Sequence, residues 1–171
     1  MAQNRRITTD YVRHEDRIRI TSGGDENPTL IVWVTRRLMD QVVQVLCDYV
    51  AKNTDAADHP DPTVRSAVAE MAQQSASASL VPQQRVTPDG ADAEWLADTI
   101  NIRGTAKEIR LHFLKGEDQS MAMTLTTTAL RQWLQIVRKC YADGEWAADR
   151  FPDWIHDPKT TEAPPSERVI H

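Results

Sequence analysis

The feature that most limits what this chain can fold into is a pattern that occurs twice, 91 residues apart. Residues 29–51 read as an apolar strand that runs directly into an amphipathic helix, and residues 120–142 have the same design. Adding 91 to each residue number aligns residues 17–53 with residues 108–144 without a gap, and seven of the 37 positions are identical. The equal spacing predicts a duplicated unit of two strands and a helix.

The strands are predicted from alternation and from β-branched runs. Residues 16–21 place isoleucines on one face and arginines on the other, which is typical of a half-buried antiparallel strand. Residues 30–34 are almost continuously apolar, which favours a central strand covered on both faces. The stretch 22–28 contains two glycines and a proline and is predicted to be a loop. Further strands are predicted at residues 5–12, 94–103 and 108–114.

Two long helices and a connecting helix are predicted. Thr35 is the expected N-cap of the first long helix, because its hydroxyl can accept a hydrogen bond from a first-turn N–H, and Thr126 holds the matching position in the second. Asp61 followed by Pro62 is a favourable helix start and predicts the connecting helix. Its thin apolar face is expected to consist of Val64, Val68 and Met71.

Together these patterns predict an α+β fold. Two βββα repeats, related by a pseudo-two-fold axis, are expected to form antiparallel sheet, with the two long helices packed on one shared sheet. The expected parts of a single domain over residues 1–156 are repeat one (5–53), a linker helix (61–80), repeat two (94–144) and an aromatic strap (145–156). Residues 81–93 are predicted to be a mobile loop, and residues 157–171 an extended or disordered tail.

In this outline the chain resembles the tandem repeats of the PUR/Whirly-type nucleic-acid-binding proteins, which also pair an antiparallel sheet with a following helix. The resemblance covers topology, without a shared residue motif, and it implies binding of single-stranded nucleic acid. Separately, the outward arginines Arg17, Arg19 and Arg110 are candidates for a basic binding face. Stacking of bases would need exposed aromatic rings, for which the strands offer Trp33, Trp95 and Phe113. The net charge of -5 disfavours nucleic acid as a partner.

The sequence carries no local signature of catalysis, of a metal or of a cofactor. It has no glycine-rich phosphate loop and no CxxC, HExxH or GxSxG motif. The acidic group at Asp89, Asp92 and Glu94 lacks the ligand spacing of a calcium loop. Cys47 and Cys140 fall within predicted helices and are expected to be reduced and buried. No catalytic residue, metal site or cofactor is therefore predicted.

The function that the sequence favours is association without catalysis. A cytoplasmic protein of bacterial type is expected to act as a homodimer or as an accessory subunit, with itself or another protein as partner. No apolar run is long enough to cross a bilayer, and residues 1–10 lack a secretory signal. Two alternatives stay open. One is binding of single-stranded nucleic acid by the sheet face, and the other is a small-molecule binder or enzyme with a cleft between the repeats.

Overall fold

The computed structural model describes residues 5–155, which form seven strands and three helices. The predicted α+β fold with two βββα units is confirmed. The elements are β1 (Arg6–Val12), β2 (Arg17–Gly24), β3 (Asn27–Val34), α1 (Arg36–Lys52), α2 (Pro62–Ala78), β4 (Ala93–Leu96), β5 (Thr99–Gly104), β6 (Glu108–Lys115), β7 (Gln119–Thr126) and α3 (Thr127–Asp143).

The 91-residue offset also relates the bounds of strands and helices in the structure. Adding 91 to the bounds of β2 gives the bounds of β6, and adding it to those of α1 gives those of α3. The predicted caps also match. The Thr35 hydroxyl accepts from the Leu38 N–H at 3.3 Å, and the Thr126 hydroxyl accepts from the Ala129 N–H at 3.2 Å. The chain therefore consists of a first unit, β1–β2–β3–α1, and a second unit, β5–β6–β7–α3.

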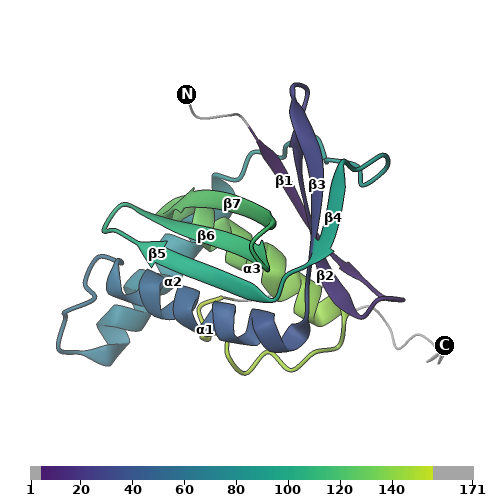
Figure 1. Ribbon diagram of the computed structural model, residues 1–171. Coiled ribbons are helices and arrows are strands. Elements are labelled where there is room, and N and C mark those ends of the chain that lie inside the picture. The colour runs from purple at the N-terminus through teal and green to yellow at the C-terminus, as the bar shows by residue number, and fades with distance from the viewer. Residues whose placement is uncertain (1–4, 156–171) are drawn as a thin grey trace.

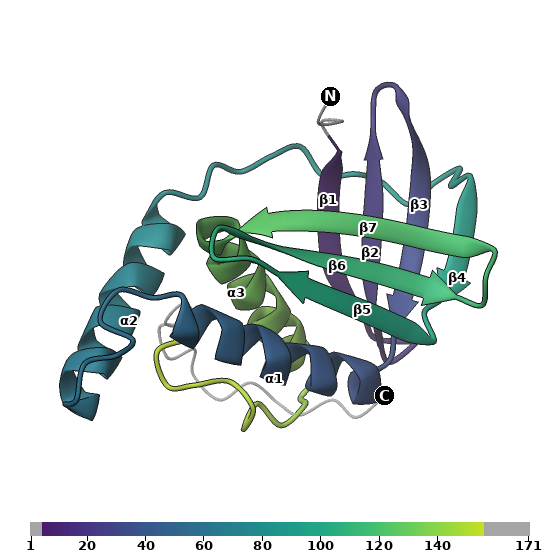
Figure 2. The ribbon, with the colours of Figure 1, turned by 60° about the vertical axis from the view of Figure 1, so that its left-hand side comes forward.

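The expectation of one shared sheet is wrong, because the strands form two sheets. Sheet A has the strand order β1-β2-β3-β4, and sheet B has the order β5-β6-β7. In Figure 2 the strands of sheet B cross in front of those of sheet A. All pairs are antiparallel except that of β3 with β4, which is parallel.

The two sheets are separate because the predicted strand 94–103 is broken in its middle. The Ala97 N–H donates to the Trp33 carbonyl in sheet A at 2.9 Å. The next N–H, of Asp98, donates to the Leu114 carbonyl in sheet B at 3.0 Å. The chain thus leaves one sheet and enters the other between two consecutive residues. Apolar alternation identifies which residues face a core, but it does not identify which strand lies alongside.

One buried cluster joins both sheets to α1 and α3, and it contains the buried apolar residues of both helices. Residues 145–155 pack against this cluster. The Trp146 ring lies edge-to-face on Tyr11 and Tyr141, with centroids 5.4 Å and 5.2 Å away. The last residue of the predicted strap and the predicted tail 157–171 lie outside the described residues.

The connecting helix α2 packs on α3 through polar contacts, and its predicted apolar face is wrong at Met71, although Val64 and Val68 are half-buried. Met71 is 69% exposed, whereas Ala69, Gln73 and Ala76 are buried. The central contact is Arg131 of α3, which is only 3% exposed. Burial lowers the pKa of this guanidinium from its ordinary value. Its hydrogen-bond acceptors are the Ala69 carbonyl (3.4 Å), Gln73 Oε1 (3.5 Å) and Thr54 Oγ1 (2.5 Å), and it stacks over the Trp154 ring at 5.2 Å.

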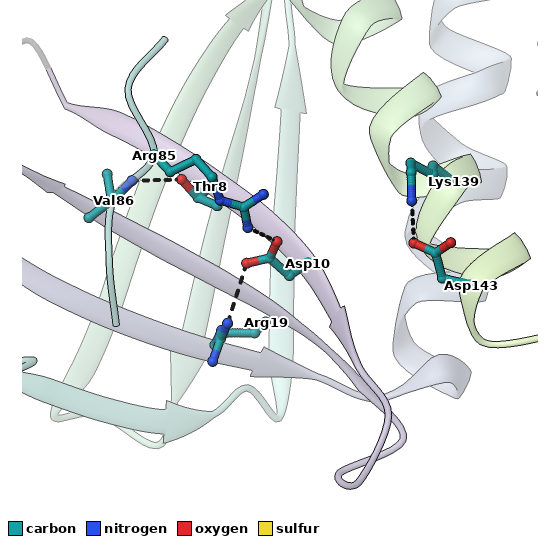
Figure 3. Close-up of polar contacts among 7 residues, drawn as sticks. All are labelled: Thr8, Asp10, Arg19, Arg85, Val86, Lys139 and Asp143. Carbon is teal, nitrogen blue, oxygen red and sulfur yellow. Dashed lines mark hydrogen bonds and ion pairs between the residues drawn. The ribbon is translucent and has the colours of Figure 1, made fainter. Parts of the chain in front are cut away.

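Residues 80–92, here called the connector, cross the outer face of sheet A. Most of this segment was predicted to be a mobile loop. The Val86 N–H donates to Thr8 Oγ1 at 2.9 Å (Figure 3), and Asp92 exchanges two hydrogen bonds with Thr29 at 2.7 Å and 2.8 Å. The predicted loop 22–28 is instead largely strand. A Cβ atom on Gly23 would lie 3.0 Å from the Val86 side chain, so the glycine lets the connector approach the sheet closely.

Candidate functional site

A groove with a volume of about 750 Å³ lies where the connector, β1, β7 and α3 meet. It is here called the inter-unit groove, because β1 belongs to the first unit and β7 and α3 to the second. Its lining is apolar over much of its length and charged at several points. The apolar residues include Ile7, Leu80, Val81, Met123, Leu125, Trp133 and Ile136, and the charged ones are Arg5, Asp10, Arg85, Lys139 and Asp143.

Helix α3 forms one wall of the groove. Gln132, Ile136, Lys139 and Asp143 follow one another at spacings of three and four residues, which places them on one side of the helix. Beside them, the buried Trp133 indole donates its N–H to Thr9 Oγ1 of β1 at 3.0 Å. This bond holds the helix of the second unit against the edge strand of the first.

Several of the charged groups at the groove are neutralised within the protein (Figure 3). The Asp10 carboxylate accepts from Arg85 of the connector and from Arg19 of β2, the latter at 3.5 Å. Lys139 Nζ lies 2.6 Å from Asp143 Oδ2, one helical turn further along α3. Because these charges already have partners, they are poorly suited to act as an unsatisfied anchor for a small charged ligand.

The connector presents unusual groups at the rim of this groove. Leu80 and Val81 are 46% and 76% exposed, although both are large aliphatic side chains. In residues 81–85 no backbone C=O group, and no N–H group of the four residues other than Pro82, forms a hydrogen bond within the described part of the chain. Unpaired, extended backbone next to exposed apolar side chains resembles the edge of a sheet, which is a template for pairing with another chain.

The one cysteine that lines the groove is not an activated nucleophile. Cys140, which lines it, is buried, and burial raises the pKa of its thiol to about 12. A thiol with that pKa stays protonated and is a poor nucleophile. Among residues 5–155 there is also no group of three or more His, Cys, Asp or Glu side chains that could hold a metal ion. The arrangement is suited to binding. The prediction that Cys47 and Cys140 are free and buried is confirmed.

The two thiols predict how stability depends on pH. Burial raises the pKa of Cys47 as well as that of Cys140 from 9.0 to about 12. Above pH 9 the unfolded chain loses thiol protons that the folded chain keeps, so the free energy of unfolding should fall between pH 9 and about pH 12. Urea unfolding over this range should show a shallower fall for a Cys47→Ala/Cys140→Ala variant. If the free energy of unfolding falls equally steeply with pH in both proteins, the raised pKa values of the two thiols are contradicted.

The structure does not bring the three predicted arginines onto one sheet. Arg17 and Arg19 lie on β2 of sheet A, whereas Arg110 lies on β6 of sheet B. Arg17 lies 3.9 Å from Glu15, and Arg19 is paired with Asp10. Arg110 is exposed and lies directly opposite Arg103 of β5.

The aromatic side chains considered for base stacking are not free on a sheet face either. Trp95 and Phe113 are buried, and the half-buried Trp33 indole donates to Glu94 Oε1 at 2.6 Å. The residues that sequence reasoning missed are those of the groove rim. The available signal was the adjacent apolar pair Leu80-Val81 in an otherwise polar stretch.

In comparisons with protein-family models, curated proteins and solved structures, no match to this chain was found. No helix within residues 5–155 has the length and apolar character needed to cross a membrane. Function is therefore inferred from the inter-unit groove and from the two sheet faces.

Proposed function

We propose that this protein acts by association without catalysis, and that its inter-unit groove receives an extended segment of a partner protein. The observation that carries this proposal is the unpaired backbone of residues 81–85 beside the exposed Leu80 and Val81. An extended segment laid along the connector satisfies these backbone groups as an added strand does. Its side chains on one face then reach the apolar lining formed by Trp133 and Ile136.

The two exposed side chains contribute a moderate part of the free energy of binding. Covering the exposed parts of Leu80 and Val81 contributes about 2 kcal/mol in total, by area. The backbone hydrogen bonds add to this, and the ordering of the partner segment opposes it. The partner is a second copy of this chain or a different protein, and light scattering of the purified chain separates the two cases.

Substitution of Leu80 and Val81 at the groove rim tests the proposal. A library of displayed heptapeptides is selected on the full chain, and the enriched peptides are measured against a Leu80→Asp/Val81→Asp variant. Placing two carboxylates on the apolar rim should weaken binding by at least about tenfold. The matched control is Met71→Asp, which changes an apolar residue on α2 whose exposure lies between those of Leu80 and Val81, and this variant should bind as the unmodified chain does.

Two results would overturn the proposal. One is that the enriched peptides bind the Leu80→Asp/Val81→Asp variant unchanged. The other is that no peptide is enriched and the chain stays monomeric in light scattering at high concentration.

A small-molecule binder is the second candidate, because the groove volume falls within the range of about 300–1,000 Å³ that is typical of such sites. The paired charges and the protonated Cys140 thiol favour binding over catalysis at this place. A small ligand of the groove should raise the unfolding temperature of the unmodified chain, and this shift should be lost in the Leu80→Asp/Val81→Asp variant.

A further inference from the structure

The two units allow the outer faces of sheets A and B to be compared position by position. β2 pairs with β3 in the same register as β6 pairs with β7, so the 91-residue offset holds across both pairs. The row Asp10, Arg19 and Trp33 of sheet A corresponds to the row Arg103, Arg110 and Thr124 of sheet B. The next row, Thr8, Thr21 and Ile31, corresponds to Asn101, His112 and Ala122.

In sheet A this face is occupied by the connector. Arg85 pairs with Asp10, and the Val86 N–H donates to Thr8 (Figure 3). The Val86 side chain also lies close to Gly23. As a result, side chains that point away from the core are nevertheless buried. Thr21 is 0% exposed and Ile31 is 4% exposed. Sheet A therefore demonstrates, within this protein, how an extended polypeptide can lie across such a face.

In sheet B the same face is open. His112 and Ala122 are half-buried where their counterparts Thr21 and Ile31 are buried. Arg103 and Arg110 are exposed where Asp10 and Arg19 are half-buried. Figure 1 shows sheet B in front of α3, with no described segment crossing in front of the strands.

The charge at the equivalent position is reversed. In sheet A, the carboxylate of Asp10 receives the guanidinium of Arg85. In sheet B, Arg103 stands in the place of Asp10 and lies directly opposite Arg110. Neither of these two arginines forms an ion pair within residues 5–155. Like charges directly opposite each other on paired strands are destabilising, and an incoming carboxylate would relieve their repulsion.

We infer that the outer face of sheet B docks an extended, acidic polypeptide segment of a partner protein, with carboxylates on Arg103 and Arg110. The segment lies across the strands as the connector lies across sheet A. A polypeptide fits better than single-stranded nucleic acid, because the outer rows of sheet B carry no tryptophan, tyrosine or phenylalanine on which bases stack. Thr124 of this face also lines the groove, but Arg103 and Arg110 do not, so docking on these two arginines does not depend on the proposed function.

The test is binding of a fluorescein-labelled peptide of alternating glutamate and valine to the full chain, followed by fluorescence anisotropy. An Arg103→Glu/Arg110→Glu variant should bind this peptide at least about tenfold more weakly. The same variant should bind a peptide of alternating lysine and valine more tightly than the unmodified chain does. The matched control is Arg37→Glu/Arg150→Glu, which changes two other exposed arginines by the same total charge and should retain binding of the acidic peptide.

The inference is overturned if the acidic peptide does not bind, or binds the Arg103→Glu/Arg110→Glu variant equally well. It is also overturned if a thymidine oligonucleotide binds through these arginines and the acidic peptide does not. The Leu80→Asp/Val81→Asp variant separates the two surfaces. It should still bind the acidic peptide. Loss of binding in this variant would indicate that the peptide binds in the groove and not on sheet B.

Discussion

Replacement of Phe113 by alanine should lower the free energy of unfolding by about 3–5 kcal/mol, as measured by urea unfolding. Phe113 is 0% exposed on the inner face of β6 and belongs to the cluster that joins both sheets to α1 and α3. Its counterpart under the 91-residue offset is Ser22 of β2, which is also buried. The two units therefore contribute one large and one small side chain at equivalent positions, and removal of the large one leaves a cavity.

A Phe113→Leu variant should lose clearly less stability, because it keeps most of the buried apolar volume. Unfolding followed by tryptophan fluorescence and by far-UV circular dichroism should give coincident transitions, since both units share one core. Two separate transitions, or a loss below about 1 kcal/mol for Phe113→Ala, would contradict a shared core.

Replacement of Arg131 by alanine should cost about 2–4 kcal/mol and loosen α2 from α3. The change removes the donors to Thr54, Gln73 and the Ala69 carbonyl, and leaves these acceptors without their partner. It also removes the cation that stacks over Trp154. Urea unfolding gives the loss of stability, and hydrogen exchange should show faster exchange across α2.

The Arg131→Met variant separates packing from hydrogen bonding, because it fills much of the same volume without a donor. Its free energy of unfolding should lie between that of the unmodified chain and that of Arg131→Ala. If Arg131→Ala is as stable as the unmodified chain, the cost of burying this charge equals what its bonds contribute, and α2 is held by other contacts.

Sequence periodicity was sufficient to locate most elements of this fold. Apolar residues at helical spacing located α1 and α3, and threonines marked where both helices begin. Alternation located β2 and β6, because one face of each strand is buried in the core. These features depend on local chemistry and on burial, which a sequence records directly.

Features that depend on contacts between distant residues could not be predicted in this way. The break between Ala97 and Asp98 sends β4 and β5 into different sheets, yet both sides of it have strand-forming residues. The burial of Gln73 in α2 was not predicted, because its partner is the Arg131 carbonyl, 58 residues away in sequence. The connector was read as a loop because its contacts with Thr8 and Asp10 come from side chains and not from a strand ladder.

The same limit applies to the candidate sites. Arg19 and Arg110 are equivalent positions in sequence, and both were predicted to belong to one basic face. Their surroundings differ because Asp10 lies opposite the first and Arg103 opposite the second. Strand register sets these neighbours, and alternation along a single strand carries no information about it.

Hydrogen exchange at residues 83–85 tests the groove proposal most directly. In the free protein the amides of Gln83, Gln84 and Arg85 have no hydrogen-bond acceptor within the described residues, so they should exchange rapidly. A peptide selected on the full chain should slow their exchange on binding, and the effect should be absent in the Leu80→Asp/Val81→Asp variant. Slow exchange of these amides in the free protein, or no change when the peptide binds, would contradict the proposal that this backbone pairs with a partner segment.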